Sequence, residues 1–332
     1  MKDKNTLKQY IYIVLLVITL ILISKSTARF TANKKHDGNI NIKNHPCKGE
    51  LGPGAKYIIN KEGGLDYIKS KPAPDFSKIA DTKEGMFMAE DDCGESYYFR
   101  GVSDNWVSFA GFYWRIIRIN GDGSIRLIYS GTKENNTGNG AEIGVSKYKA
   151  INDASAYYDT STIKTIVDNW YKTNIQDKGY DNKIANTGYC NDMSEKSSYL
   201  SSSYYRLHTN KTPLLKCPNK DRDLLSKSNN KLTYPVGLLA HDEVSFAGGI
   251  YSNYNTPYVN KNYYLYTGKK FWTMTPAEWD NDDGFVGSVE PDGSLGYDYM
   301  ENSQGVRPVL SLKSEVLVSA GNGTELNPYI VS

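Results

Sequence analysis

A nearly uninterrupted apolar run at residues 10–23 is the first regular pattern along the chain. It follows a lysine-rich start and precedes small and polar residues, the order of parts found in secretory signals. The run holds about 14 residues, whereas a helix that spans a bilayer usually needs about 20. We therefore predict a signal peptide or membrane anchor at residues 1–28. A cleaved signal and a retained anchor, whose helix would extend over residues 7–28, both fit this pattern.

Regular patterning is weak at residues 29–83, where proline, glycine and lysine recur. Such residues interrupt helices and strands. We therefore predict a lead-in or stalk at residues 29–83 and a folded domain at residues 84–332.

Stretches rich in aromatic and β-branched residues predict strands within that domain. A hairpin turn is expected at residues 120–123, because Asn and Gly tolerate the positive φ angles that such turns need. The expected strands are at residues 96–100, 106–119 (as a pair), 124–129, 271–274, 284–289, 294–299, 305–312 and 329–331.

One main helix is expected at residues 161–178, where apolar residues recur at helical spacing. Ser161 or Thr162 can cap its start and Gly179 can end it. A shorter helix is expected at residues 242–247. The predicted class is therefore α+β, mostly β.

Composition narrows the class of partner. The chain has 39 Lys and Arg against 37 Asp and Glu, a net charge of +2. Such a balance gives no electrostatic reason to expect nucleic-acid binding. The 27 tyrosines fit the half-buried strands of an extracellular β-rich protein or, alternatively, a ligand-binding surface.

Four cysteines follow the N-terminal run: Cys47, Cys93, Cys190 and Cys217. An even number in an exported chain predicts two disulfides, for which three pairings are possible. Cys190 and Cys217 lie in one polar, loop-rich region with little apolar material to order it. We therefore predict that these two pair, which leaves Cys47 to pair with Cys93.

Residues typical of catalysis are sparse. His208 and His241 are the only histidines in the predicted domain, and no Gly-x-Ser-x-Gly motif accompanies them. No Cys/His spacing is typical of a zinc site. We therefore predict no catalytic residue, no metal site and no enzyme activity.

The region between residues 272 and 301 combines aromatic and acidic side chains. Its carboxylates could bind calcium, although their spacing differs from an EF-hand loop, and the alternative is a solvated acidic loop. Its aromatics could hold a sugar ring or a partner protein, with Trp279 the best candidate for an exposed ring; the alternative is core packing. The predicted ligand-binding residues are Trp272, Trp279, Asp280, Asp282, Asp283, Tyr297 and Tyr299.

Seven segments appear together in this order: residues 97–101, 107–118, 188–192, 215–217, 234–243, 264–268 and 305–312. In this combination the chain resembles, over roughly residues 84–332, a family of uncharacterised exported proteins of Firmicutes whose C-terminal part is a domain of unknown function. That family is similar in fold to C-type-lectin-like and sulfatase-modifying-factor domains, through a Trp-containing strand and a Gly-Val-Arg-Pro strand.

The resemblance implies a C-type-lectin-like domain at residues 84–332. Met274 departs from the commoner pattern, in which an Arg often follows the Trp of the first strand. The sulfatase-modifying activity is not implied, because it needs paired cysteines late in the chain and no cysteine follows Cys217.

These observations predict an exported or surface-anchored, non-enzymatic binding or adhesion module for a surface glycan or protein. One alternative is a structural subunit of a surface assembly, held by its N-terminal helix. A further alternative is a hydrolase or another enzyme with an unrecognised site, because a fold by itself does not fix function. The expected location is extracellular or at the cell surface, with the membrane as a partner if the N-terminal segment is retained.

Overall fold

Strands outnumber helices in the part of the chain that the structure describes. The structure is a computed structural model, and it describes residue 47 and residues 49–133, 138–150, 156–252, 259–280 and 283–332. The predicted α+β class with mostly β structure is confirmed for this part. The signal or anchor predicted at residues 1–28 lies outside it. None of the helices within the described ranges is long and apolar enough to cross a membrane.

The larger sheet joins segments from both ends of the described chain. Its main path runs β11–β16–β5–β4–β3–β18–β17, and β2 pairs with both β4 and β1. The last strand, β18, lies parallel to β3, with Tyr329 opposite Val107. Its strands are β1 (Lys83–Asp91), β2 (Gly94–Gly101), β3 (Trp106–Phe109), β4 (Phe112–Ile119), β5 (Ile125–Tyr129), β11 (Val236–Gly237), β16 (Val309–Leu312), β17 (Val318–Ala320) and β18 (Tyr329–Val331).

A second sheet carries the region in which we predicted ligand binding. Its main path is β14–β13–β12–β15–β6, with β9 paired to β12 and β8 paired to β9. The strands are β6 (Val145–Lys147), β8 (Glu195–Ser197), β9 (Leu200–Ser201), β12 (Phe271–Asp280), β13 (Asp283–Val289), β14 (Leu295–Tyr299) and β15 (Ser303–Gly305). A short separate pair joins β7 (Tyr189–Cys190) to β10 (Leu224–Leu225).

β12 is longer than the strand predicted at residues 271–274. Proline has no backbone N–H and normally interrupts a strand, so Pro276 predicts an end to the pattern. The ladder between β12 and β13 instead shifts its register on both sides of Pro276 and continues to Asp280. Most of the region expected to form an acidic loop is therefore a β-hairpin.

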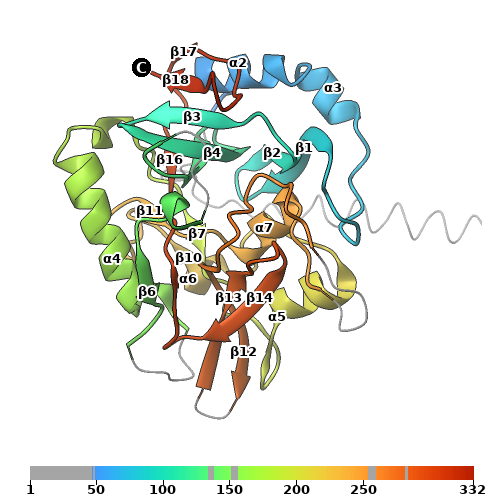
Figure 1. Ribbon diagram of the computed structural model, residues 1–332, viewed down its shortest axis with the longest axis vertical. Coiled ribbons are helices and arrows are strands. Elements are labelled where there is room, and N and C mark those ends of the chain that lie inside the picture. The colour runs from blue at the N-terminus through green and yellow to red at the C-terminus, as the bar shows by residue number, and fades with distance from the viewer. Residues whose placement is uncertain (1–46, 48, 134–137, 151–155, 253–258, 281–282) are drawn as a thin grey trace, which may run out of the picture. The chain divides into compact units, whose positions relative to one another are not determined.

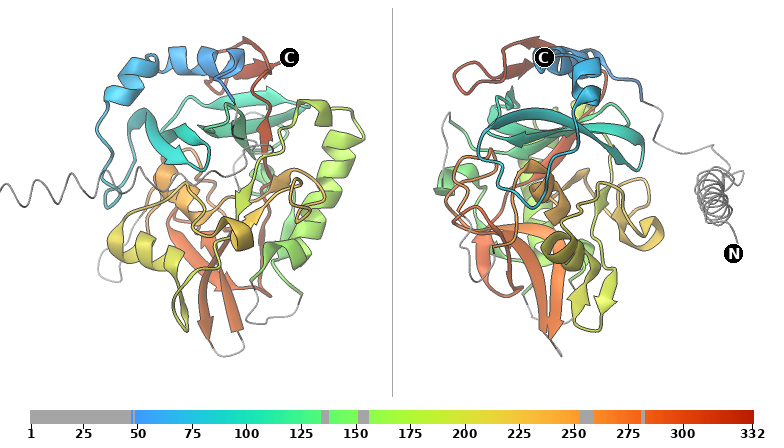
Figure 2. Two further views of the ribbon diagram at one scale, coloured as in Figure 1. Left: turned by 180° about the vertical axis from the view of Figure 1, so that it is seen from behind. Right: turned by 90° about the vertical axis from the view of Figure 1, so that its right-hand side faces the viewer.

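Short helices cover the sheets (Figures 1 and 2). The predicted main helix is present as α4, which ends at Tyr171 and continues as a π-helical segment at Lys172–Gln176. The Ser161 side chain accepts a hydrogen bond from the Lys164 backbone N–H, and Gly179 adopts a φ of 76° after the π-helical segment. The short helix predicted at residues 242–247 is α7. The helices are α2 (Pro53–Lys61), α3 (Leu65–Ser70), α4 (Thr162–Tyr171), α5 (Ser202–Tyr205), α6 (Lys220–Asp223) and α7 (His241–Ala247).

The lead-in predicted at residues 29–83 is, where the structure describes it, part of the folded unit. Residues from 46 onward belong to one compact unit that ends at Ser332. The apolar face of α2 buries Ala55, Ile58 and Ile59 in the main hydrophobic core. These buried apolar side chains stabilise the docked helix, which Figure 1 shows beside β17 and β18. The folded part thus begins well before residue 84.

Buried ion pairs tie the larger sheet to α7. The Glu243 carboxylate of α7 forms ion pairs with two arginines. Its Oε1 lies 2.6 Å from Nε of Arg126 in β5 and 3.3 Å from Nε of Arg118 in β4. Arg118 also pairs with Asp91 at 2.8 Å. Arg307, by contrast, donates to two backbone carbonyl oxygens, those of Tyr129 and Leu265. These contacts supply the partner that a buried arginine requires.

Candidate functional site

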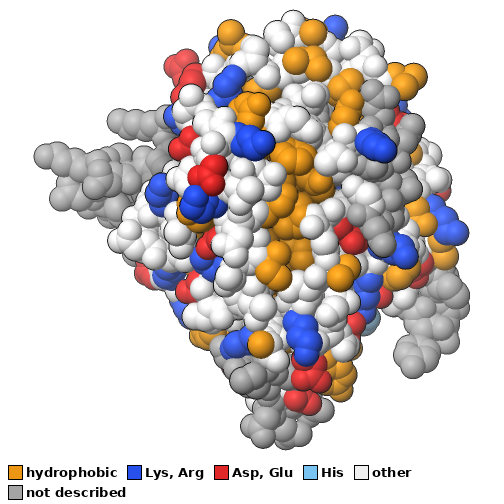
Figure 3. All heavy atoms as spheres, turned by 60° about the vertical axis from the view of Figure 1, so that its left-hand side comes forward, with side chains coloured by type: hydrophobic (Ala, Val, Ile, Leu, Met, Phe, Trp, Pro, Cys, Tyr) orange, Lys and Arg blue, Asp and Glu red, His pale blue; other side chains and the backbone are white. Residues whose placement is uncertain are grey.

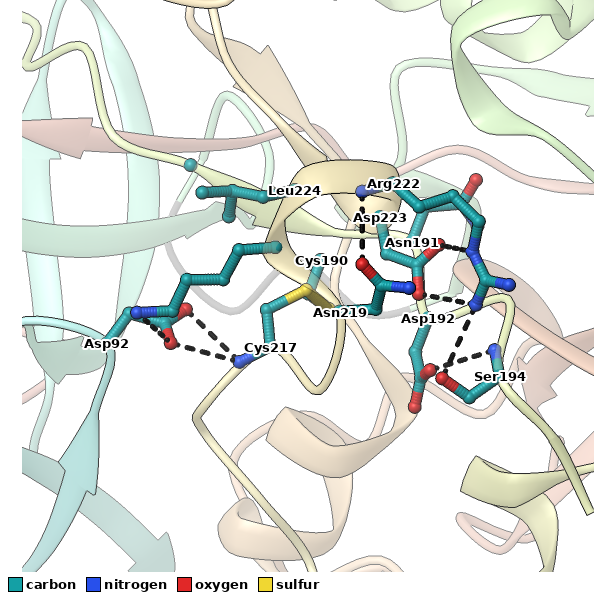
Figure 4. The surroundings of a disulfide bond; sticks show 12 residues. Asp92, Cys190, Asn191, Asp192, Ser194, Cys217, Asn219, Arg222, Asp223 and Leu224 are labelled. Atoms are coloured by element: carbon teal, nitrogen blue, oxygen red, sulfur yellow. Dashed lines mark hydrogen bonds and ion pairs between the residues drawn. A yellow bond between two sulfur atoms is a disulfide. The ribbon is translucent and has the colours of Figure 1, made fainter. Parts of the chain in front are cut away.

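Both predicted disulfides are present in the structure. Cys190 is bonded to Cys217, and Cys47 to Cys93. Asp92 lies between the two bridges: its carboxylate accepts the Cys217 backbone N–H at 3.1 Å and pairs with Lys220 at 3.1 Å (Figure 4). Disulfides persist in oxidising compartments, so this pair of bridges points to an extracellular or otherwise oxidising environment.

The two tryptophans predicted to bind ligand are buried. Trp272 is 1% exposed; its indole N–H donates to the Ser146 carbonyl, and its ring packs edge-on against Tyr148. Trp279 is only 9% exposed, which corrects the expectation that it is an exposed ring. The cause is the extension of β12, which places Trp279 opposite Gly284 in the ladder. Both rings are therefore positioned to stabilise the fold.

The acidic residues do not form a metal-binding group where the structure describes them. Asp283 begins β13 and is half-buried. Asp282 and the side chain of Asp280 lie outside the described residues. Among the residues that are described, no three His, Cys, Asp or Glu side chains are arranged to hold a metal ion. The calcium hypothesis stays a prediction.

The two predicted tyrosines do come together with other aromatic residues. Phe285 of β13 lies opposite Glu278 on one side and Tyr299 on the other. Residues opposite each other in a ladder point to the same face, and so do residues two positions apart in one strand. Tyr297 therefore shares this face. The Phe285 ring lies 4.4 Å from that of Tyr299 and 5.7 Å from that of Tyr297, centroid to centroid.

A second group of rings, carried by α5 and the helical turn after it, reaches the same face. The Tyr204 ring lies 5.7 Å from Tyr297 and 4.9 Å from Tyr251. His208, one helical turn after Tyr204, stacks on it at 5.0 Å with nearly parallel rings. We call Tyr204, His208, Tyr251, Phe285, Tyr297 and Tyr299, together with Glu278, the aromatic site. Figure 1 shows α5 near the hairpin strands that carry the rest of it.

Exposure differs across the aromatic site. Tyr251 is buried, and its hydroxyl lies 3.0 Å from Nδ1 of the buried His241. Tyr204, Phe285 and Tyr297 are half-buried, and Tyr299 is 41% exposed. The rings thus lead from the core to solvent. Such a graded surface can take a ring-shaped ligand without losing its support from the core.

Glu278 gives the aromatic site its charge. Burial raises the pKa of its carboxyl, and a hydrogen bond from the Tyr297 hydroxyl opposes that shift. The carboxylate in turn contributes, after burial, to raising the pKa of Tyr297 to about 12. Burial lowers the pKa of the neighbouring His208, as does the charge of Lys211. The aromatic site thus combines aromatic rings with a carboxyl group whose pKa is raised by burial.

Sequence patterns indicated only part of this arrangement. Tyr297 and Tyr299 were predicted, and Glu278 lies in the aromatic and acidic region between residues 272 and 301. Tyr204 and His208 lie in a stretch that reads as a polar loop. Their spacing of four residues, which places side chains on one helix face, was the available signal.

A second surface cluster lies beside α4. Figure 3, turned toward that side of the molecule, shows hydrophobic side chains gathered near the middle of the face. Between α4 and the larger sheet, the Phe112 ring of β4 lies 5.4 Å from that of Trp170 of α4, and both rings contact the buried Trp114 and Tyr129. These contacts join a helix to a sheet, so we interpret the cluster as packing that holds α4 in place.

Comparison of the chain with protein-family models, with curated proteins and with solved structures found no match. Any functional assignment must therefore rest on the geometry described above.

Proposed function

We propose that the chain is an exported, non-enzymatic binding protein that takes a glycan through the aromatic site. The C-type-lectin-like fold and the cell-surface location expected from the sequence belong to this proposal. The two disulfides support a place outside the reducing cytoplasm. A protein ligand at the same site is the competing version of the proposal.

One observation carries the choice of a glycan: three strands and α5 bring half-buried rings and a carboxylate to one face. Aromatic faces pack against the apolar faces of sugar rings, and a carboxylate accepts hydrogen bonds from sugar hydroxyls. Tyrosine and phenylalanine supply this contact area at a small cost in conformational entropy, because each has only two side-chain torsions.

The test is a glycan array probed with the full, oxidised chain, followed by titration of the best ligand. Tyr299→Ala should weaken binding by about 2 kcal/mol, or roughly 30-fold, as aromatic hot spots do. The melting temperature should change little, because Tyr299 is 41% exposed. Tyr157→Ala is the matched control, since Tyr157 is 40% exposed and lies outside the aromatic site.

Two outcomes would contradict the proposal. Equal affinity of the Tyr299→Ala and Tyr157→Ala variants would show that binding occurs elsewhere. Absence of any glycan ligand, together with capture of a protein partner that Tyr299→Ala abolishes, would replace the glycan with a protein at the same site.

A further inference from the structure

Glu278 differs from most of the buried carboxyl groups in the part of the chain that the structure describes. Most buried carboxylates elsewhere in the described structure pair with arginine: Asp91 with Arg118, Glu243 with Arg126, Asp192 and Asp242 with Arg206, and Asp223 with Arg222. Glu142 is buried without such a pair, but it lies near Arg307 and Lys269. Glu278 forms no ion pair with any described residue. A partly buried charge without a partner is costly, so this position calls for an explanation.

Glu278 also differs from the other carboxyl groups whose pKa is raised mainly by burial. Glu62, Glu142 and Asp168 also have raised pKa values, but each has a lysine or arginine near enough to oppose the shift. Among the described residues, Tyr297 opposes the pKa shift of Glu278 through a hydrogen bond from its hydroxyl, and no lysine or arginine contributes. Among the described residues, Glu278 is thus surrounded by aromatic rings and a hydroxyl, whereas Glu62, Glu142 and Asp168 each have a lysine or arginine nearby.

A carboxylate surrounded by aromatic rings attracts a cation through two kinds of interaction. The carboxylate supplies a full charge, and ring faces attract a cation within about 6 Å of their centroids. The ring centroids of Tyr204, Tyr297 and Phe285 follow one another at 5.7 Å steps, so a cation beside Glu278 can lie within reach of more than one ring. Sugar hydroxyls would satisfy the rings but would leave the charge of Glu278 unbalanced.

We infer that the ligand of the aromatic site is an amino sugar whose amine is free and protonated, with Glu278 as its counter-ion. The inference rests on the proposed function and names its ligand class. Glu278 supplies the ion pair, Tyr297 holds the carboxylate through its hydroxyl, and Phe285 and Tyr299 carry the sugar ring. Acetylation would remove the positive charge of the amine, so the site would distinguish the two forms of one sugar.

The experiment compares oligomers of glucosamine with oligomers of N-acetylglucosamine of equal length, titrated against the full, oxidised chain in low-salt buffer slightly below neutral pH. We expect the free-amine oligomer to bind at least about tenfold more tightly, the scale of one charge-assisted contact. Glu278→Gln keeps the side-chain size and an acceptor for Tyr297 but removes the charge, and it should abolish this preference. The control is Glu301→Gln, an exposed carboxylate just after β14, which should leave the preference intact.

The outcomes separate the inference from the proposed function. If both oligomers bind equally and both depend on Tyr299, glycan binding stands and the assignment of the amine is wrong. A preference that survives Glu278→Gln in a folded variant, checked by its melting temperature, also overturns the inference. If neither oligomer nor any array glycan binds, the proposed function itself fails. Tight binding of an oligolysine peptide in place of the amino sugar would assign the cation to a protein ligand instead.

Discussion

Removal of the Cys190–Cys217 disulfide should destabilise the fold without changing its architecture. The two cysteines are 27 residues apart. In the chain-entropy relation a closed loop of this size restricts the unfolded chain enough to stabilise the native state by about 3.6 kcal/mol at 25 °C. The compact unit spans roughly 290 residues, for which an unfolding entropy of about 2.1 cal/mol/K per residue converts that loss into a melting-temperature decrease of about 6 °C.

The assay is thermal unfolding of the Cys190→Ser/Cys217→Ser double variant, with the Cys47→Ser/Cys93→Ser variant measured beside it. The second bridge joins residues 46 apart, so the same relation gives about 4 kcal/mol, and the two variants should unfold at similar temperatures. The Asp92 contact to the Cys217 backbone does not need the bridge and should survive. A double variant that melts within 1 °C of the parent would refute the reasoning, because it would show that other contacts already order this region in the unfolded chain.

Three further predictions concern buried side chains. Glu243→Gln should cost about 3 kcal/mol in urea unfolding, because it leaves Arg126 buried without its carboxylate; a change under 1 kcal/mol would contradict this. Burial lowers the pKa of His241 to about 4 from an ordinary 6.5, so its contribution to stability is complete above pH 6.5 and is lost as pH falls toward 4. About 2 kcal/mol should disappear between pH 7 and pH 5, and His241→Gln should flatten that part of the stability profile. Trp279→Ala should lower stability by about 3 kcal/mol, seen as a lower melting temperature; an unchanged value would mean that the ring is not core.

The sequence predicted those elements of the fold that depend on interactions between residues close in the chain. The main helix was predictable because its cap at Ser161 and its terminating Gly179 lie next to it in sequence. The extent of β12 was not, because Pro276 interrupts the pattern and only pairing with β13 carries the strand past it. That pairing also determines the burial of Trp279, which the sequence pattern left exposed.

The aromatic site was harder to predict for the same reason. Tyr297 and Tyr299 alternate along a single strand, so their common face follows from the strand itself. Tyr204 lies more than 90 residues earlier and meets them only because β9 pairs with β12 and places α5 beside the hairpin. The pattern of apolar residues within one segment cannot predict a contact between segments so far apart in the chain. That no described lysine or arginine lies near Glu278 is likewise a property of the assembled site.

The parallel pairing of β18 with β3 has a consequence for how this chain acquires its structure. Val107 of β3 must pair with Tyr329 of β18, about 220 residues away, before β18 and β17 can join the larger sheet. Such long-range contacts slow folding, because the entropy of closing a long loop is lost before the contact forms. A chain that folds slowly stays unfolded for longer, and passage through a membrane channel requires an unfolded chain. For the exported protein proposed above, we therefore expect this topology to delay formation of the sheet until the chain has crossed the membrane.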